Sequence, residues 1–213
     1  ISDKESKVFY QKVMFAYKIN GIDLNKQEAK KLKTLRDRNR ILESEFAKNI
    51  AENIPILDFE ESELDGLPKD LIDSNKQKDG KIKIKLVSSN LVSIITQCNV
   101  RESREKAAKA SGEYAKPLNK KVAIEFLKNS REIAQLCGFN NYSELAMATK
   151  MIENPAEATN FIETLKDSSQ ERLTKEIQAI KKIKLQTGDK SKLSKTDKSY
   201  YGERLVEKLS GVK

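Results

Sequence analysis

The 213-residue sequence contains no histidine, and this absence excludes several kinds of catalytic site. An H-E-x-x-H zinc site, a Ser-His-Asp triad and a Cys-His pair all need at least one imidazole. The 8 glycines are scattered along the chain and form neither G-x-G-x-x-G nor a P-loop pattern. We therefore predict no catalytic, metal-binding or cofactor-binding residue in this chain.

Glycine, proline and aromatic residues are scarce, whereas charged residues are abundant. There are 8 Gly, 4 Pro and 6% aromatic residues against 34% charged residues, a balance typical of long solvated helices rather than of a β-sandwich. The longest apolar run is too short to cross a bilayer, so we expect no transmembrane helix. Cys98 and Cys137 fit no metal or redox spacing. We interpret both as small buried residues of a protein in a reducing compartment.

The first residues, "ISDKESKVFYQKV", lack an initiator methionine and have neither a secretory nor a transit-peptide composition. We therefore expect the chain to begin inside a longer protein or after a cleavage.

The net charge of +9 is unevenly distributed along the chain. Residues Ile56 to Asp73 hold seven acids and one lysine, whereas residues Lys175 to Lys213 hold eleven basic and five acidic residues. A basic end can attract nucleic acid through long-range electrostatics. However, lysine outnumbers arginine and no aromatic residues interleave the basic run as base-stacking platforms would. A solvated helix face is therefore the favoured interpretation.

The first part of the chain predicts a hairpin of two long helices. The first should span about residues 3–19 and end near Gly21, which can take the left-handed conformation, while Asn25 can cap the second, over about 26–53. That second helix carries one narrow stripe, formed by Leu32, Leu35, Asn39, Leu42, Phe46 and Ile50. Polar Asn39 interrupts the stripe, which favours packing inside a bundle over a free coiled-coil dimer.

The middle of the chain breaks the helical rhythm. Pro55 and Pro68 exclude a continuous helix. "KIKIKL" alternates strictly and places Ile82, Ile84 and Leu86 on one face, as in a half-buried strand. We predict a two-stranded antiparallel element over about residues 54–59 and 81–86. A lone hairpin is only marginally stable, so it should pack against helices.

The remainder of the chain is predicted to be helical, over about residues 89–98, 101–115, 119–137, 142–151 and 155–187, and again from 194. Gly138 and Gly188 follow helix ends, where a left-handed residue is favoured. Asn154, Pro155 and Glu157 suit the N-cap, first and third positions of the longest helix. We thus predict an all-α fold with one small β element. It should form a single helical region over 1–213, divided into a long-helix hairpin (1–54), an irregular β insert (55–88) and a helical bundle (89–213).

Two further patterns have both a structural and a functional interpretation. The acid pair Glu60-Glu61 lies in the acidic segment, where a solvated loop is favoured over a general acid/base pair. Tyr200-Tyr201 opens the last helix, and we interpret it as an aromatic packing contact. A ligand contact through a phenol is the alternative.

Several motifs occur in a characteristic order along the chain. They are "NGIDLNKQEAKKLKTLRDRNRILESEFAKNI" with Phe46 and Asn49, "ELDGLPKDLI", "KIKIKL", "NVRESREKAAKA" with Arg101, Arg104 and Ala110, "REIAQLCGFNNYSELAMATKMIENPAEATNFI", and "TDKSYYGERL". Together they resemble the N-terminal half of the thimet oligopeptidase and oligopeptidase A family of zinc metallopeptidases. The resemblance spans about residues 21–209. Cys137 replaces a leucine of the family pattern, Ile152 an alanine and Thr196 a tryptophan, and "SGEYAKPLNKK" lacks the usual "Y-x-x-R-A" end.

The resemblance implies a parent enzyme that cleaves short peptides in a deep channel between two helical halves. In this family the zinc ligands and catalytic groups lie C-terminal to the residues matched here, so none is transferred to this chain, and zinc is expected only in the missing catalytic part. The resemblance further implies that Phe139 and Tyr142 are packing anchors at an elbow between two channel-wall helices, and that Lys150-Met151 are family-typical residues of that elbow.

On this interpretation, the chain alone is inert, its partner is the catalytic half of the same protein, and short peptides are substrates of the parent. The expected location is the cytoplasm, with the matrix of a mitochondrion or another organelle as the alternative. The isolated chain should expose an apolar strip and can self-associate through it. The alternatives are a stand-alone adaptor that evolved from such a peptidase, and a non-enzymatic helical interaction module that binds nucleic acid through Lys175–Lys213.

Overall fold

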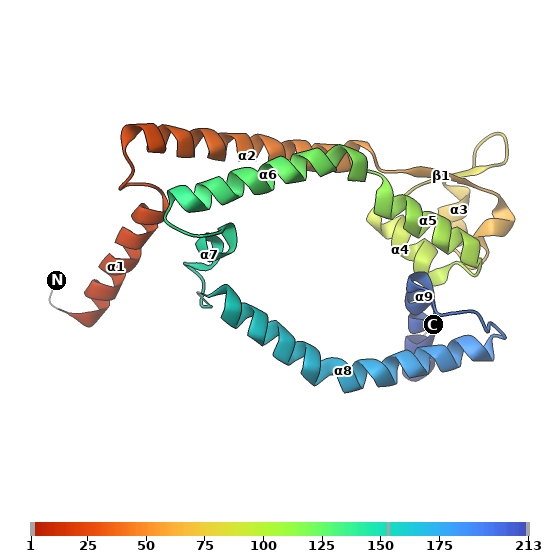
Figure 1. Cartoon of the computed structure of the whole chain (residues 1–213). Coiled ribbons are helices and arrows are strands. Elements are labelled where there is room, and N and C mark those ends of the chain that lie inside the picture. The colour runs from red at the N-terminus through yellow and green to blue at the C-terminus, as the bar shows by residue number, and fades with distance from the viewer. Residues whose placement is uncertain (1–2, 153, 212–213) are drawn as a thin grey trace. The chain divides into compact units, whose positions relative to one another are not determined.

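The computed structural model describes residues 3–152 and 154–211 (Figure 1). The chain divides into two compact units, each assembled from two separate stretches of sequence. Unit 1 is Ile1–Asn49 with Leu118–Asp167, and unit 2 is Ile50–Pro117 with Ser168–Lys213. Within the described residues, no helix is long and apolar enough to cross a membrane.

The fold is mostly α-helical with a two-stranded antiparallel sheet, which confirms the predicted fold class. The strands are β1 (Ile56–Phe59) and β2 (Ile82–Lys85), and a 3-10 turn, η1, spans Glu61–Leu64. The α-helices are α1 (Lys4–Ile19), α2 (Lys26–Glu52), α3 (Lys69–Asp73), α4 (Ser88–Gln97), α5 (Arg101–Glu113), α6 (Lys116–Leu136), α7 (Tyr142–Met147), α8 (Pro155–Gln186) and α9 (Lys195–Ser210).

Helix boundaries in unit 1 follow the signals found in the sequence. Gly21 has a φ of +89° and Gly138 a φ of +85°, so each supplies the left-handed residue that its helix end needs. The Asn25 side chain accepts hydrogen bonds from the amides of Gln27 and Glu28 at 3.0 and 2.9 Å and thereby caps α2. Asn154 Oδ1 accepts the amide of Ala156 at 2.8 Å at the start of α8.

The pairing of α2 with α6 forms the body of unit 1 (Figure 1). The two helices run antiparallel, because Lys31 meets Glu132 near one end and Asn49 meets Asn119 near the other. Leu32, Asn39 and Leu42 of the predicted stripe are buried, whereas the outermost members remain 39% (Phe46) and 37% (Ile50) exposed. The stripe is therefore the packing face of α2, but α6 covers only part of it.

Asn39 interrupts this stripe as a buried polar residue. Its exposed fraction is 8%, and its Nδ2 donates to Ser130 Oγ of α6 at 3.1 Å. A buried amide with a partner on the facing helix stabilises one register of the pair. The contact shows that α2 packs against another helix of the same chain, and its packing inside a larger bundle stays a prediction.

The core of unit 2 lies against one face of the two-stranded β-hairpin formed by β1 and β2. Strands β1 and β2 pair from Ile56–Lys85 to Phe59–Ile82, and the alternation in "KIKIKL" buries Ile82 (0%), Ile84 (0%) and Leu86 (5%). The hairpin packs on helices, as expected for an element that is marginal alone. The buried core consists of Phe59, Leu64, Leu67, Ile82, Ile84, Leu86, Ile94, Cys98 and Ala107.

Gly66 marks a close approach of two backbone segments in unit 2. Its φ is +90°, and a Cβ at this position would lie 2.6 Å from the carbonyl oxygen of Gln97. The same loop is held by the amide of Asn99, which donates to the carbonyl of Asp65 at 2.7 Å. Only glycine satisfies both the backbone conformation and the spacing.

Several boundaries differ from those predicted. Helix α7 ends at Met147 rather than near 151, and Met151 is fully exposed beyond it. Helix α6 begins at Lys116 rather than near 119, because Pro117 is tolerated in a first turn. Cys98 is fully buried as expected, whereas Cys137 is only partly buried; both thiols are free.

Helix α8 is exposed to solvent along its middle. Every residue from 159 to 176 is exposed, including Phe161, Ile162, Leu165 and Leu173 at 49–62%. Intrahelical ion pairs are present here, such as Arg172–Glu176 at 2.9 Å. Helix α1 likewise buries no residue and exposes Phe9, Tyr10 and Tyr17 by half or more.

Candidate functional site

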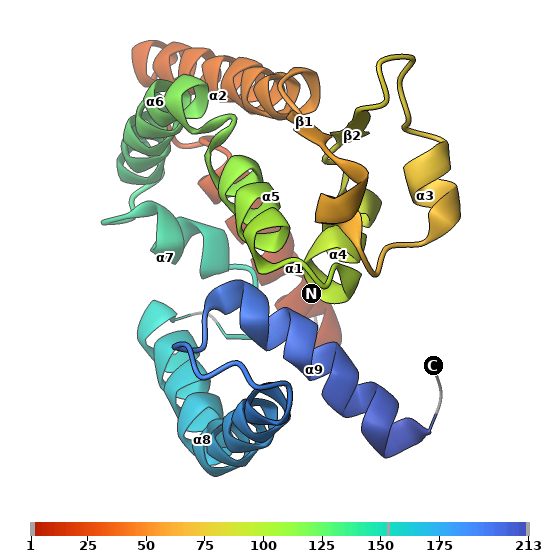
Figure 2. The ribbon, with the colours of Figure 1, turned by 90° about the vertical axis from the view of Figure 1, so that its right-hand side faces the viewer.

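In unit 2, helix α9 contacts α4 and α5 (Figure 2). A cluster of charged side chains lies at this contact. Arg101 and Arg104 come from α5, Lys184 from the last turns of α8, and Asp197 from the first turn of α9. Arg104 and Asp197 are 93 positions apart along the chain, and the fold brings them together.

Asp197 is the centre of the cluster. Its side chain is 0% exposed and has three cations around it: Arg104 Nη2 at 3.3 Å, Arg101 Nη2 at 3.4 Å and Lys184 Nζ at 3.9 Å. It also forms a capping box with Ser194, whose amide donates to Asp197 Oδ2 at 3.0 Å. Burial raises the pKa of Asp197, but the Ser194 hydrogen bonds and the charges of Arg101 and Lys184 together hold it below its usual range.

Arg104 extends the cluster into the core. Its side chain is 2% exposed, and Nη1 donates to the carbonyls of Cys98 and Asn99 at 2.8 and 3.1 Å. The guanidinium carbon lies 3.9 Å from the centroid of the Tyr200 ring, and that of Arg204 lies 3.3 Å from the same centroid. Burial raises the pKa of Tyr200, whose hydroxyl donates to Asn99 Oδ1 at 2.7 Å. Tyr200 is thus fixed between stacking contacts and a hydrogen bond.

Lys184 connects the cluster to the loop between α8 and α9. It is 3% exposed, forms an ion pair with Asp189 and donates to Ser191 Oγ at 2.9 Å. The hydrogen bond from Lys184 holds the pKa of Asp189 well below its usual range, with further hydrogen bonds from Ser191. The interpretation of Lys175–Lys213 as a solvated face is therefore wrong at Lys184. Exposed lysines such as Lys181 and Lys182 agree with it, and Lys213 lies outside the described residues.

The arrangement suits a structural role. Asp197 and Arg104 are closed to solvent, so a substrate cannot reach them in this conformation. Tyr200 and Tyr201 are 8% and 5% exposed, and their rings pack edge to face with centroids 4.9 Å apart, as the packing interpretation predicts. The cluster holds α9 and the preceding loop on α5; we assign it no chemistry. Glu60 and Glu61 lie exposed on η1 and its cap, where Glu61 pairs with Lys76 at 2.8 Å.

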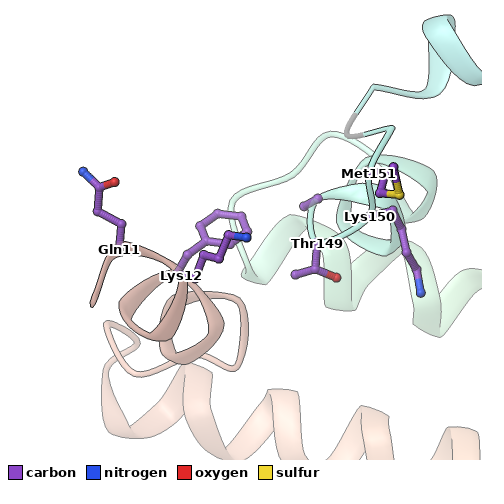
Figure 3. Close-up of a pocket in the computed structure, with 7 residues that line it drawn as sticks. Gln11, Lys12, Thr149, Lys150 and Met151 are labelled. Carbon is purple, nitrogen blue, oxygen red and sulfur yellow. The ribbon is translucent and has the colours of Figure 1, made fainter. Parts of the chain in front are cut away.

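Unit 1 contains a hollow of about 710 Å³ between α1 and the connector after α7. Figure 3 shows Lys12 of α1 extending toward the connector that carries Thr149, Lys150 and Met151. Within the preceding elbow, Phe139 is half-buried but Tyr142 is 46% exposed. Tyr142 therefore does not act as a buried anchor within this chain. Asn141, which the sequence analysis missed as a cap, accepts the Glu144 amide at 3.0 Å.

Two adjoining cavities lie along α2 and α6. The first, about 360 Å³, is lined almost wholly by apolar side chains: Leu42, Glu43, Phe46, Val122, Ala123, Phe126 and Leu127. The second, about 460 Å³, includes Arg36, Asn39, Arg40, Glu43, Phe126 and Tyr142 in its lining. Glu43 and Phe126 line both cavities, so the two adjoin, and we refer to them together as the groove, with an apolar end and a charged end. Sequence reasoning missed this groove, although Arg36, Asn39, Arg40 and Glu43 follow helical spacing on α2.

Within residues 3–152 and 154–211, no group of three or more cysteine, aspartate and glutamate side chains is placed to hold a metal ion.

Comparison with known proteins relates this helical chain to a class of peptidases. It is 27% identical over 212 residues to oligopeptidase A of Haemophilus influenzae, covering 92% of this chain and 31% of that protein. It is 22% identical over 204 residues to a probable thimet oligopeptidase of Arabidopsis thaliana, covering 95% of this chain and 29% of that protein. It is 25% identical over 212 residues to oligopeptidase A of Escherichia coli, covering 92% of this chain and 31% of that protein.

A model of the family described as Peptidase family M3 matches residues 94–213, which is more than half of the chain, and the chain belongs to this family. It spans less than a third of the length of these curated relatives. The matched region includes both arginines of α5 and the whole of α9, so the charge cluster lies within it.

Proposed function

We propose that this chain is the N-terminal, non-catalytic helical region of a zinc metallo-oligopeptidase and forms part of the wall of a substrate channel. The observation that carries the proposal is the family match over residues 94–213, combined with a sequence that contains no histidine. A chain without histidine cannot supply an H-E-x-x-H zinc site. The catalytic part and its zinc would then belong to the rest of the parent protein.

The helical architecture supports this role. Helix α2 has 27 residues and α8 has 32, so they extend about 40 and 48 Å at 1.5 Å per residue. Stiff elements of this length can frame a narrow channel that admits short peptides and excludes folded proteins. The buried cluster around Asp197 would keep α9 fixed on α5 while a peptide occupies the channel.

Exposed apolar side chains on α1 and α8 also support the proposal. Phe9 of α1 is 71% exposed, and Ile162 and Leu165 of α8 are 62% and 54% exposed. Such residues on neighbouring turns usually mark surfaces that another segment or protein covers. We expect the catalytic part of the parent to cover some of them, and the isolated chain to bind a hydrophobic dye and to self-associate at high concentration.

The proposal places the parent in the cytoplasm, with an organelle matrix as the alternative. A relative named mitochondrial intermediate peptidase supports the alternative. Localising a tagged parent protein in its own cell would decide between them.

Two experiments test the proposed function. Reading the gene beyond Lys213 should show an H-E-x-x-H motif. The 213-residue chain should not hydrolyse a quenched fluorescent octapeptide with or without zinc, whereas the longer protein should, and a chelator or replacement of either zinc-motif histidine should abolish that activity. Chelator-sensitive hydrolysis by the 213-residue chain would refute the proposal. A gene that ends near Lys213 would instead favour the non-enzymatic interaction module or adaptor.

A further inference from the structure

The α2/α6 pair has two different flanks. On one flank, Lys31 pairs with Glu132 at 2.9 Å, and Arg38 holds Glu125 through two hydrogen bonds at 2.6 and 2.8 Å. At 100° per residue, Arg36, Arg40 and Glu43 point to the opposite side of α2 from Arg38. That opposite flank carries the groove formed by the two adjoining cavities.

The charged end of the groove holds groups of both signs. Arg36 is held in place because it donates to Asn20 Oδ1 and to the Ile19 carbonyl, both at 3.1 Å. These bonds occupy two of its five N–H donors. Arg40 lies one turn further along α2 and donates to Asp37 at 2.9 Å. Glu43, another turn along, lines both cavities.

Asn39 lies between these charges and lines the same cavity. Its side chain is buried, and its Oδ1 accepts no hydrogen bond from residues 3–152 or 154–211. A buried acceptor without a donor costs about 1–3 kcal/mol. Because this oxygen is itself closed to solvent, Asn39 contributes to the cavity wall but offers no acceptor that a ligand reaches in this conformation.

The spacing of the charges limits the length of a ligand. Arg36 and Glu43 are seven positions apart, which is about 10.5 Å along a helix axis. An extended peptide spans at most about 3.3–3.6 Å per residue, so a peptide of about three residues reaches from one charge to the other. The apolar cavity beside Glu43 then receives the side chain of the first residue.

We propose that this groove binds a peptide of about three residues with free termini and a large apolar first residue. The α-carboxylate lies at Arg36 and Arg40, and the α-ammonium lies at Glu43. The first side chain fills the cavity between Leu42, Phe46, Val122 and Leu127. This inference rests on the proposed function, because it assigns the groove the same substrate class, as a place where a short peptide or a cleavage product is held.

The test is an NMR titration of the ¹⁵N-labelled 213-residue chain with the tripeptide Leu-Gly-Gly. We expect saturable shifts at residues of α2, α6 and α7. N-acetylation or C-amidation of the peptide should each weaken binding about two- to fivefold, because each removes one partly exposed ion pair and a loss of that size changes Kd by this factor. Gly-Gly-Gly should bind more weakly than Leu-Gly-Gly because it leaves the apolar cavity empty.

Two variants assign the contacts. Glu43→Gln should weaken binding of Leu-Gly-Gly but not of its N-acetylated form, and Arg40→Gln should weaken binding of the free acid but not of the amide. Lys33→Gln is the matched control for Arg40→Gln, because Lys33 also pairs with Asp37, at 2.7 Å, but does not line the groove. It should bind Leu-Gly-Gly with the affinity of the unmodified chain.

Equal affinity for free and blocked peptides, shifts confined to unit 2, or no saturable shift at millimolar peptide would each overturn the proposal. Shifts at the groove on dilution of the chain alone would assign it to a second copy instead. Hydrolysis by the longer protein without peptide binding here would refute only this inference. Peptide binding here by a gene product that lacks peptidase activity would refute only the proposed function.

Discussion

Replacing Asp197 with asparagine removes the carboxylate at the centre of the unit 2 cluster while keeping the size of the side chain. In the native chain this carboxylate is 0% exposed and lies within 3.9 Å of three cationic groups. The amide has no charge, so Arg104 and Lys184, at 2% and 3% exposed, lose one of their counterions while still buried.

The expected loss of stability follows from this burial. Removing one partner of a buried ion pair costs about 3–5 kcal/mol, because the remaining charge stays buried. The oxygen of the introduced amide still accepts one hydrogen bond from Ser194, so part of the capping box survives, and we expect the lower half of that range. For a chain of 150–250 residues, about 2–4 °C in Tm corresponds to each kcal/mol. The variant should therefore melt roughly 6–16 °C below the native chain.

Thermal and urea unfolding followed by circular dichroism measure this loss. Asp37→Asn is the matched control, because Asp37 also has two basic partners, at 2.7 and 2.9 Å, but its side chain is 42% exposed. An exposed pair contributes about 0–1 kcal/mol, so the control should melt within a few degrees of the native chain. Should Asp197→Asn fail to fold, Arg101→Gln removes a partner that is 28% exposed and should give an intermediate loss. Equal melting temperatures for the Asp197 and Asp37 variants would refute the reasoning.

Three further predictions concern pH, a loop and the core. The pKa of Asp197 is lowered in the folded chain, so its contribution to folding stability is present above the unfolded pKa of about 3.9 and is lost as pH falls below that value. Between about pH 6 and pH 2, the melting temperature should therefore fall less steeply for Asp197→Asn than for the native chain. Gly66→Ala should cost more stability in urea unfolding than Gly80→Ala, because both have positive φ but a Cβ at Gly80 meets nothing within 4 Å; equal losses would contradict the close approach at Gly66. Ile94→Ala truncates a side chain that is 0% exposed and should lower the free energy of unfolding by about 2–5 kcal/mol. Val92 is 53% exposed, so Val92→Ala should change Tm little. Equal losses of stability in the two variants would be inconsistent with this packing.

Much of the secondary structure could be predicted because its signals are local. The helix ends at Gly21 and Gly138 can be recognised without knowledge of distant residues. The same holds for the strand, which follows from the strict alternation of "KIKIKL". The end of α7 was missed because no glycine or proline follows Met147 until Pro155. The end of α7 therefore has no stop signal in the local sequence.

Burial of charge could not be predicted in the same way. Lys184 belongs to a run of lysines that is typical of a solvated face, and its partners Asp189 and Asp197 come from the following loop and helix. The acidic partner of Arg104 is Asp197 on α9, more than ninety positions further along the chain. The groove depends on α7 as well as on α2 and α6, so no single helical pattern could reveal it.

The exposed middle of α8 has a consequence for how the chain opens. Most of the stability of a helix in a protein comes from tertiary packing, and residues 159 to 176 have no buried side chain to hold them in helical form. Their helical state depends on backbone hydrogen bonds and on surface pairs such as Lys175–Glu171. In the isolated chain, amide hydrogens of this span should exchange with deuterium before those of α2 and α5, and trypsin should cut first near Arg172 and Lys175. A partner that covers this helix would slow both processes, so protection against exchange and cleavage would report when the chain is assembled.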